Sequence, residues 1–161
     1  MTAADDNRAY TVAETEGLAY WFAGALMITK ATADQTGGAF ALLDQTVPGG
    51  YAPPRHIHRE EDEAWYLLDG RVIFYCGSRT LAAGPRSFVF LPRGLEHTFK
   101  VGEDGARMLT ITVPASFASF VAAAGQPAPQ LTPPPPGPLD PERLAEVAAE
   151  YGIDITGPPP A

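Results

Sequence analysis

Two histidines and a glutamate within one short segment constrain the fold more than any other feature of the sequence. His56, His58 and Glu63 lie in the segment 50–70. Residues two apart in a β-strand point to the same face, so His56 and His58 can share one ion. The polar residues between His58 and Glu63 can turn the chain back and bring the carboxylate to the same point. Imidazole and carboxylate groups that converge in this way indicate a transition-metal site with open coordination positions.

A second segment carries the third histidine. It reads Pro92-Arg93-Gly94-Leu95-Glu96-His97. Proline presets the φ angle of a turn and glycine closes it, so His97 leads out of a turn. The chain has three histidines in 161 residues, and all of them lie in these two segments. If the histidines had unrelated roles, at least one would be expected outside these two segments. We therefore expect His97 to join the other two at one site.

The two segments resemble the two sequence motifs of the cupin superfamily. The first motif, G-x5-H-x-H-x4-E-x6-G, is matched at its fixed positions by Gly50, His56, His58, Glu63 and Gly70. The core of the second, P-x-G-x2-H, is matched by Pro92, Gly94 and His97. The chain departs from the family at two positions, with Arg86 in place of a usual glycine and Val101 in place of a frequent asparagine. The resemblance implies an all-β jelly-roll barrel with a metal ion bound by His56, His58, Glu63 and His97.

The sequence around these motifs is typical of many short strands. Runs rich in β-branched and aromatic residues alternate with Gly, Pro and Asp over residues 18–113, as in a sandwich or barrel. Asp69-Gly70 reads as a tight hairpin turn, because glycine tolerates the positive φ that such turns need. Residues 102–105 read as a further turn between two strands.

Two short α-helices are expected after the barrel. Apolar residues recur at helical spacing in residues 114–125 and 140–152, on either side of a proline-rich connector. We therefore expect a flexible N-terminal arm over residues 1–17, a cupin barrel over 18–113, and helices, connector and tail over 114–161.

Composition limits the partners that the protein can have. The formal net charge is −8, which argues against binding to nucleic acid or to an anionic membrane surface. Its single cysteine, Cys76, excludes an internal disulfide and fits a reducing compartment. The N-terminal residues lack the basic start and apolar run of a signal peptide, so we expect a cytoplasmic location.

Three imidazoles and one carboxylate suit Fe, Ni, Co, Cu, Mn or Zn rather than Ca or Mg, which prefer oxygen ligands. The ligand set does not choose among these six metals. Glu63 has two possible roles, as a permanent ligand or as the catalytic base that takes a proton from a bound hydroxyl group. The neighbouring acids, Glu60, Glu61 and Asp62, read as a solvated turn.

An apolar cavity is expected around the metal. Trp65 and Leu67 share the parity of Glu63 along a strand, and Phe99 that of His97, so these side chains should point into the same space as the ligands. We take Trp65, Leu67 and Phe99 as candidate substrate-binding residues. Such a cavity suits an aromatic or polyketide-like molecule better than a sugar phosphate, which would need Arg and Lys.

The arrangement of the whole chain also resembles small bacterial single-domain cupins grouped with quercetin 2,3-dioxygenase. This resemblance implies a metal-dependent oxygenase in which a flavonol-like enol or phenol reacts with O2. A metal-assisted polyketide cyclase or isomerase, and a cupin that only binds a small molecule, stay open as alternatives. We also expect a homodimer, in which the apolar segment Tyr20-Trp21-Phe22 adds to a partner's sheet.

Overall fold

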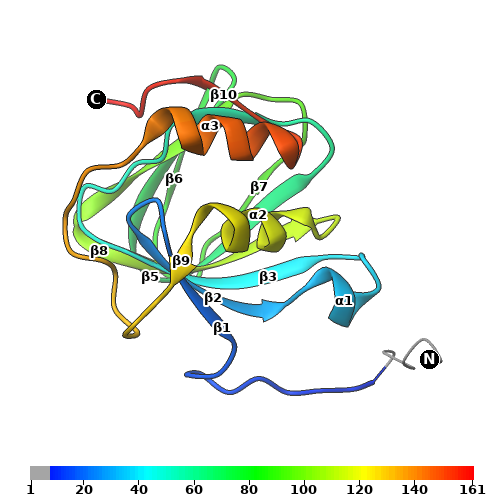
Figure 1. Ribbon diagram of the computed structural model, residues 1–161. Helices are drawn as coiled ribbons and strands as arrows, with labels where there is room; N and C mark the ends of the chain where they lie inside the picture. Colours follow the sequence, from blue (N-terminus) through cyan, green and yellow to red (C-terminus); the bar gives the residue numbers. More distant parts are fainter. Residues whose placement is uncertain (1–7) are drawn as a thin grey trace.

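The computed structural model describes residues 8–161, so that residues 1–7 of the expected arm lie outside the described residues. Ten strands, all paired antiparallel, form one continuous sheet that curls into the expected jelly-roll barrel (Figure 1). The strands are β1 (Leu18–Phe22), β2 (Ala25–Ala31), β3 (Ala41–Val47), β4 (Arg55–His58), β5 (Asp62–Cys76), β6 (Arg79–Ala83), β7 (Phe88–Leu91), β8 (His97–Val113), β9 (Gln126–Pro127) and β10 (Ile153–Gly157).

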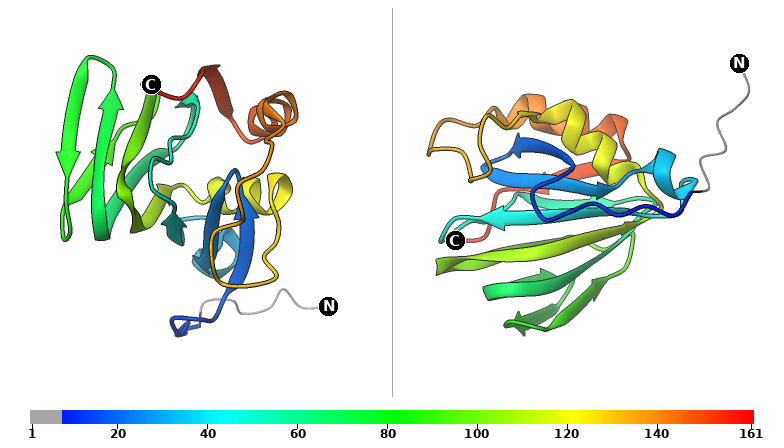
Figure 2. Two further views of the ribbon diagram at one scale, coloured as in Figure 1. Left: turned by 90° about the vertical axis from the view of Figure 1, so that its left-hand side faces the viewer. Right: turned by 90° about the horizontal axis from the view of Figure 1, so that it is seen from below.

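Both expected C-terminal helices are present, as α2 (Ser116–Ala124) and α3 (Pro141–Glu150). They lie together on the side of the molecule away from the β5–β6 hairpin (Figure 2). Asp140 caps α3, because its side chain accepts a hydrogen bond from the N–H of Arg143. A third helix, α1 (Ala33–Thr36), is a single turn that the sequence analysis did not predict. It has a capping box formed by Thr32 and Gln35.

The prediction of a hairpin turn at Asp69-Gly70 is wrong. β5 continues through this point to Cys76, and its register against β8 shifts on both sides of Gly70. Gly70 has a φ of 86°, and a Cβ atom there would lie 2.3 Å from the carbonyl oxygen of Gly105. The glycine therefore serves a bulge where two long strands bend against each other.

The expected turn at residues 102–105 is also not a break between strands. These four residues fall between the register pairs Gly70–Ala106 and Val72–Val101, so they bulge out of β8 opposite the irregularity in β5. Arg86, which stands where cupins usually have glycine, has a φ of 67°. The chain thus keeps at this position the left-handed backbone that glycine favours.

The C-terminal segment completes the sheet beside the first motif. β10 pairs antiparallel with β4, placing Ile153 opposite His58 and Ile155 opposite His56. On its other side β4 shares one register pair with β8, His56 with His97. The strand that carries two of the expected ligands is therefore held mainly by the end of the chain.

The edge expected to form the dimer is occupied within the chain. Tyr20 and Trp21 pair with β9, and the indole nitrogen Nε1 of Trp21 donates a 2.7 Å hydrogen bond to the carbonyl oxygen of Thr132. Phe22 is buried against Phe117 and Phe120. A homodimer stays a prediction, and it would need another surface. Among residues 8–161, no helix has the length and apolar character needed to cross a membrane.

Candidate metal centre

Backbone hydrogen bonds join the two motifs to each other. Pro53 and Pro54 lead into β4, and the Pro92–Gly94 turn leads into β8. The N–H of Gly94 donates to the carbonyl oxygen of His58 at 2.8 Å, and the N–H of Arg93 donates to Asp62 Oδ1 at 3.0 Å. The turn that delivers His97 is therefore anchored on the segment that carries the other ligands.

The structure brings together all four predicted ligands. One donor atom from each of His56, His58, Glu63 and His97 lies within 4.8 Å of the others. Glu63 Oε2 lies 2.9 Å from His97 Nε2 and 3.0 Å from His58 Nε2. His58, Glu63 and His97 are buried, and His56 is partly buried. Four buried donors of this kind around one point are what a transition metal requires.

Backbone carbonyl groups orient two of the imidazoles. His56 Nδ1 lies 2.7 Å from the carbonyl oxygen of Pro54, and His97 Nδ1 lies 3.1 Å from that of Leu95. A carbonyl oxygen only accepts hydrogen bonds, so each Nδ1 carries a proton and each Nε2 faces the other ligands. This is the usual support for a histidine that binds a metal through Nε2, and the residues therefore fit an ion.

Burial and neighbouring charges shift the pKa values of His56, His58 and Glu63. Burial, followed by the neighbouring His97, lowers the pKa of His56 to about 3, so its imidazole is neutral and able to coordinate. Burial acts to lower the pKa of His58, but Glu63 and Glu61 outweigh it and raise this pKa to about 10. Burial acts to raise the pKa of Glu63, and His58 and His97 outweigh it and hold the pKa well below its usual range. Glu63 is therefore ionised.

Glu61 belongs to the site, contrary to the expectation of a solvated turn. Its side chain is 4% exposed. Glu61 Oε1 lies 3.6 Å from His58 Nδ1, and Oε2 accepts a 3.1 Å hydrogen bond from the N–H of Phe117 in the first turn of α2. That helix has no side-chain cap of its own. Glu61 therefore supports a metal ligand and the start of a helix at once.

The other two acids of the run are at the surface, as expected. Glu60 is exposed, and Asp62 pairs with Arg93 through Oδ1 at 3.2 Å from Nε. A sequence of adjacent acids gives no sign of which one turns inward. Here the backbone bend between β4 and β5 decides it.

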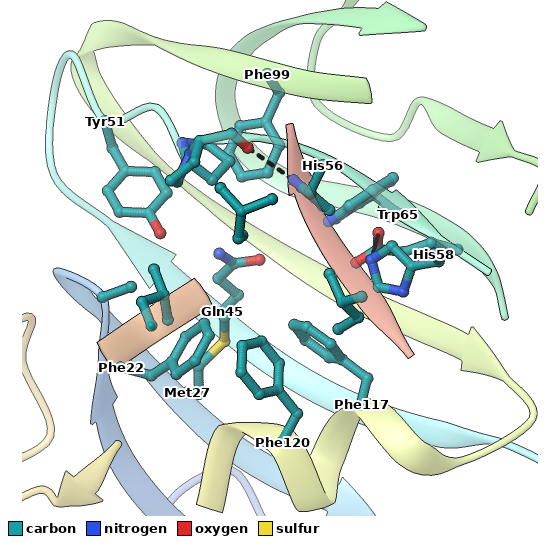
Figure 3. A pocket seen from close by; sticks show the side chains of 17 residues that line it. Phe22, Met27, Gln45, Tyr51, His56, His58, Trp65, Phe99, Phe117 and Phe120 are labelled. Carbon is teal, nitrogen blue, oxygen red and sulfur yellow. Dashed lines mark hydrogen bonds and ion pairs between the residues drawn. The ribbon is translucent and has the colours of Figure 1, made fainter. Parts of the chain in front are cut away.

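An apolar cavity opens beside the metal site, as expected, and His56, His58 and Glu63 form part of its lining (Figure 3). Trp65 and Phe99 line it, whereas Leu67 does not. Leu67 is fully buried in the barrel core, opposite Met108 in the register of β5 and β8. Leu67 shares the inward face of β5 with Glu63 and Trp65. It lies two residues beyond Trp65 along the strand, where the cavity has ended.

Elements from the C-terminal part of the chain cover this cavity. Phe117 and Phe120 of α2, Leu144 of α3, and Ile153 and Ile155 of β10 all contribute to its lining. The volume is about 60 Å³. This is room for a few water molecules, since benzene fills a cavity of about 150 Å³. An organic substrate therefore requires some of these covering side chains to move.

Two polar residues in the cavity wall were not predicted. Gln45 of β3 and Tyr51 from the loop after β3 both reach into the cavity (Figure 3). Gln45 was detectable, because Ala41, Leu43, Gln45 and Val47 alternate along one strand and the glutamine interrupts an otherwise apolar inward face. Tyr51 lies within the first motif at a position that the motif leaves free.

Residues 43–113 match the protein family described as "Cupin domain". Quercetin 2,3-dioxygenase of Bacillus subtilis (strain 168) is 24% identical over 92 residues, a match that covers 57% of this chain. The same match covers 27% of the Bacillus protein. The chain thus corresponds to about a quarter of that enzyme's length.

Solved structures support the fold. KdgF from Halomonas sp. has a TM-score of 0.57 and 12% identity, with 66% of this chain and 94% of that chain covered. A protein from Planctomyces limnophilus gives 0.58 and 17%, with 68% and 92% covered. Streptomyces Pac13 gives 0.57 and 16%, with 75% and 91% covered. Pac13 is described as a nucleoside dehydratase.

The four clustered donors all lie inside the segment that matches the family. Both motifs occupy their expected places, with His56 and His58 on β4, Glu63 on β5 and His97 at the start of β8. Sequence motifs, fold and site geometry agree: residues 43–113 match the cupin domain family, and the fold is shared with the solved structures above.

Proposed function

We propose that this protein is a metal-dependent enzyme that acts on an aromatic or enolic small molecule, as an oxygenase similar to quercetin 2,3-dioxygenase. The observation that carries the proposal is that three of the four clustered metal donors, His56, His58 and Glu63, line an apolar cavity. A site that served only to hold the barrel together would not need to border an internal space. The matching segment of the Bacillus dioxygenase adds support for the oxygenase chemistry.

The cavity wall favours a planar apolar substrate. Trp65, Phe99, Phe117 and Phe120 present aromatic rings, and the ring centroids of Phe117 and Phe120 lie 5.9 Å apart. These rings exclude water and provide flat surfaces against which another ring can stack. When bound, the metal ion would supply a Lewis acid that favours ionisation of the substrate hydroxyl group.

Glu63 is the residue that would accept the hydroxyl proton. Its Oε2 atom lies between His58 and His97, and its carboxylate is ionised at neutral pH. The low pKa of Glu63 comes from its two histidine neighbours, which outweigh the effect of burial. In the proposed reaction the substrate anion is oxidised, both atoms of O2 enter the product, and a ring opens.

Oxygen uptake tests this proposal. Metal-free protein is loaded separately with Fe, Ni, Mn, Co, Cu and Zn, and each form is incubated with quercetin and with single-ring enols and phenols. We expect at least one metal form to consume O2 in proportion to the substrate lost, and the His58→Ala variant to consume none. Turnover without O2 uptake would indicate that the protein is a cyclase or isomerase and not an oxygenase. If no fully loaded form turns over any of these compounds, the protein is one that only binds a small molecule.

A further inference from the structure

Gln45 and Tyr51 form a polar patch in the cavity wall that the metal ligands do not explain. Figure 3 shows both side chains reaching into the cavity, on the side away from His58. Gln45 is 2% exposed, and Tyr51 is partly buried. Burial also raises the pKa of the Tyr51 hydroxyl group, so this group keeps its proton. Polar groups in an apolar wall are favourable where they form hydrogen bonds, so these two side chains suit a ligand that carries a polar group.

The amide of Gln45 is oriented by the barrel. Thr110 lies on β8, and its hydroxyl group donates a 2.8 Å hydrogen bond to Gln45 Oε1. The amide oxygen is therefore engaged, and the Nε2 amino group is the part of the side chain left for a ligand. Since an amino group of this kind only donates, the position suits an acceptor oxygen.

Trp65 also lines the cavity and carries a further donor. The indole Nε1–H of Trp65 is buried and has no hydrogen-bond partner among the described residues. The hydroxyl group of Tyr51 can donate or accept a hydrogen bond. The amide Nε2 of Gln45 and the indole Nε1–H of Trp65 can only donate. The wall thus offers donors to its occupant and calls for oxygen atoms in return.

The charge of the occupant is limited by what the wall lacks. Among the described residues that line the cavity there is no Lys or Arg. A carboxylate or phosphate bound beside Gln45 would have no Lys or Arg side chain of the cavity lining to pair with, and burying it would be costly. The oxygen that meets Gln45 is therefore expected to be uncharged, as in a carbonyl or ether group.

We infer that Gln45 and Tyr51 bind an uncharged acceptor oxygen of the substrate, away from the oxygen that faces the metal ligands. The substrate class is then a phenol or enol with a second, carbonyl or ether oxygen on the far side of an apolar ring. Thr110 acts as a positioning residue, because it fixes the orientation of the Gln45 amide. This inference rests on the proposed function for which end of the substrate faces the metal ligands.

Two probes of nearly equal size test the inference. 4-Hydroxyacetophenone carries a phenol at one end and a carbonyl at the other, and 4-ethylphenol lacks the carbonyl. Both require the same opening of the cavity, so that cost cancels in the ratio of their dissociation constants. The acetyl group also makes the phenol more acidic, and this effect cancels when the ratio is compared between the parent protein and a variant.

Binding of both probes to the zinc-loaded protein is measured by calorimetry. We expect Gln45→Met, which keeps the length of the side chain but has no donor, to reduce the preference for 4-hydroxyacetophenone about fivefold to tenfold. Tyr51→Phe should reduce the preference about twofold to threefold. Thr110→Val should give a partial loss while 4-ethylphenol binds as before. Met27→Leu, in the apolar wall, should leave the ratio unchanged.

A ratio that stays within twofold of the parent in Gln45→Met overturns the inference, as does failure of the fully loaded parent to bind either probe. Gln45→Glu replaces the donor with an acceptor and should also lose the preference, so it carries the test if Gln45→Met does not fold. Zinc content is measured on each sample. An absence of zinc from the parent overturns the proposed metal site, whereas an unchanged ratio with zinc bound overturns only the role of Gln45.

Discussion

The two halves of the metal site are built in different ways. Glu63 and His97 belong to β5 and β8, strands of 15 and 17 residues that pair with each other over most of their length. His56 and His58 belong to β4, which has four residues, shares one register pair with β8 and otherwise pairs with β10 near the end of the chain. One half is part of the barrel wall, and the other is held in place by the C-terminal segment.

This difference separates two kinds of support for a ligand. In the barrel wall, the register of two long strands fixes the ligand positions, and many hydrogen bonds would have to break to move them. On β4, the ligand positions depend on a few contacts other than the long β5–β8 pairing, chiefly those of β10 and Glu61. Changes to these contacts should therefore weaken metal binding while the barrel stays folded.

Glu63→Gln should have the largest effect, because it removes the proposed base. The variant tests whether the barrel-wall half of the site does chemistry or only anchors the ion. Glutamine keeps the size and one oxygen donor of the side chain but removes its charge and basicity. If Glu63 is the base, the variant should keep most of its metal and lose turnover by about two to four orders of magnitude. The measurement is the rate of O2 uptake at matched metal content. Turnover near the parent rate in the metal-replete variant would show that Glu63 is not the base.

Glu61→Gln tests the support of the β4 half from the side of α2. The variant loses the negative charge beside His58 Nδ1 but keeps an oxygen that can accept from the N–H of Phe117. We expect metal affinity to fall about 10-fold to 100-fold, the usual cost of losing a group that supports a ligand. Affinity is measured by competition with a chelator.

The matched control is Glu60→Gln, which changes the exposed neighbour and should leave metal affinity unchanged. Equal losses of affinity in the two variants would show that general negative charge, rather than the contact of Glu61 with His58, supports the ion.

Asp154→Pro tests the support of the β4 half from the side of β10. The N–H of Arg59 donates to the carbonyl oxygen of Gly152, and the alternation of antiparallel pairs makes Asp154 and Ile57 the next hydrogen-bonded pair. Proline has no N–H, so one ladder hydrogen bond next to both histidines is lost. We expect metal affinity to fall about tenfold, with a far-UV circular dichroism spectrum close to that of the parent.

Asp154→Ala keeps the N–H and removes the exposed ion pair with Arg59, so it should bind metal like the parent. If Asp154→Pro keeps the parent's metal affinity while the Ile57 amide exchanges rapidly with solvent, β4 does not depend on β10.

Asp62→Asn should have the smallest effect, because it removes a surface ion pair beside the barrel-wall half. A hydrogen bond from the Arg93 side chain is the main cause that holds the pKa of Asp62 below its usual value. A lowered carboxyl pKa stabilises the fold above the ordinary Asp value near 4, and this contribution is lost as the pH falls below it. The difference in melting temperature between parent and variant should therefore be small at pH 7 and decrease as the pH falls from about 4 through the folded-state pKa. A difference that grows toward pH 3 would contradict this assignment.

The parts of the fold and site that could be predicted are those with a local sequence signal. The spacing of His56, His58 and Glu63, together with the turn before His97, was enough to identify four ligands that come together in the structure. The apolar cavity followed from strand parity, which places alternate side chains on one face. The two C-terminal helices followed from their apolar spacing.

The parts that could not be predicted depend on contacts between distant segments. Gly70 looks like a hairpin turn in sequence, and only its approach to Gly105 shows that it belongs to a bulge. Glu61 looks like its acidic neighbours until α2 packs over it. Leu67 has the parity of the cavity, but the curvature of β5 carries it into the core. Gln45 gave a local signal, as a single polar residue on an apolar face, that was missed.

Metal content tests the central claim most directly. Protein purified without added metal, and the same protein after incubation with excess metal and gel filtration, are analysed for transition metals alongside the His58→Ala variant. We predict close to one ion per chain in the metal-replete parent and almost none in the variant, because loss of one imidazole from a four-ligand site removes most of its affinity. No bound transition metal in the replete parent, or full occupancy retained when both His58 and His97 are replaced by alanine, would contradict the assignment of this site.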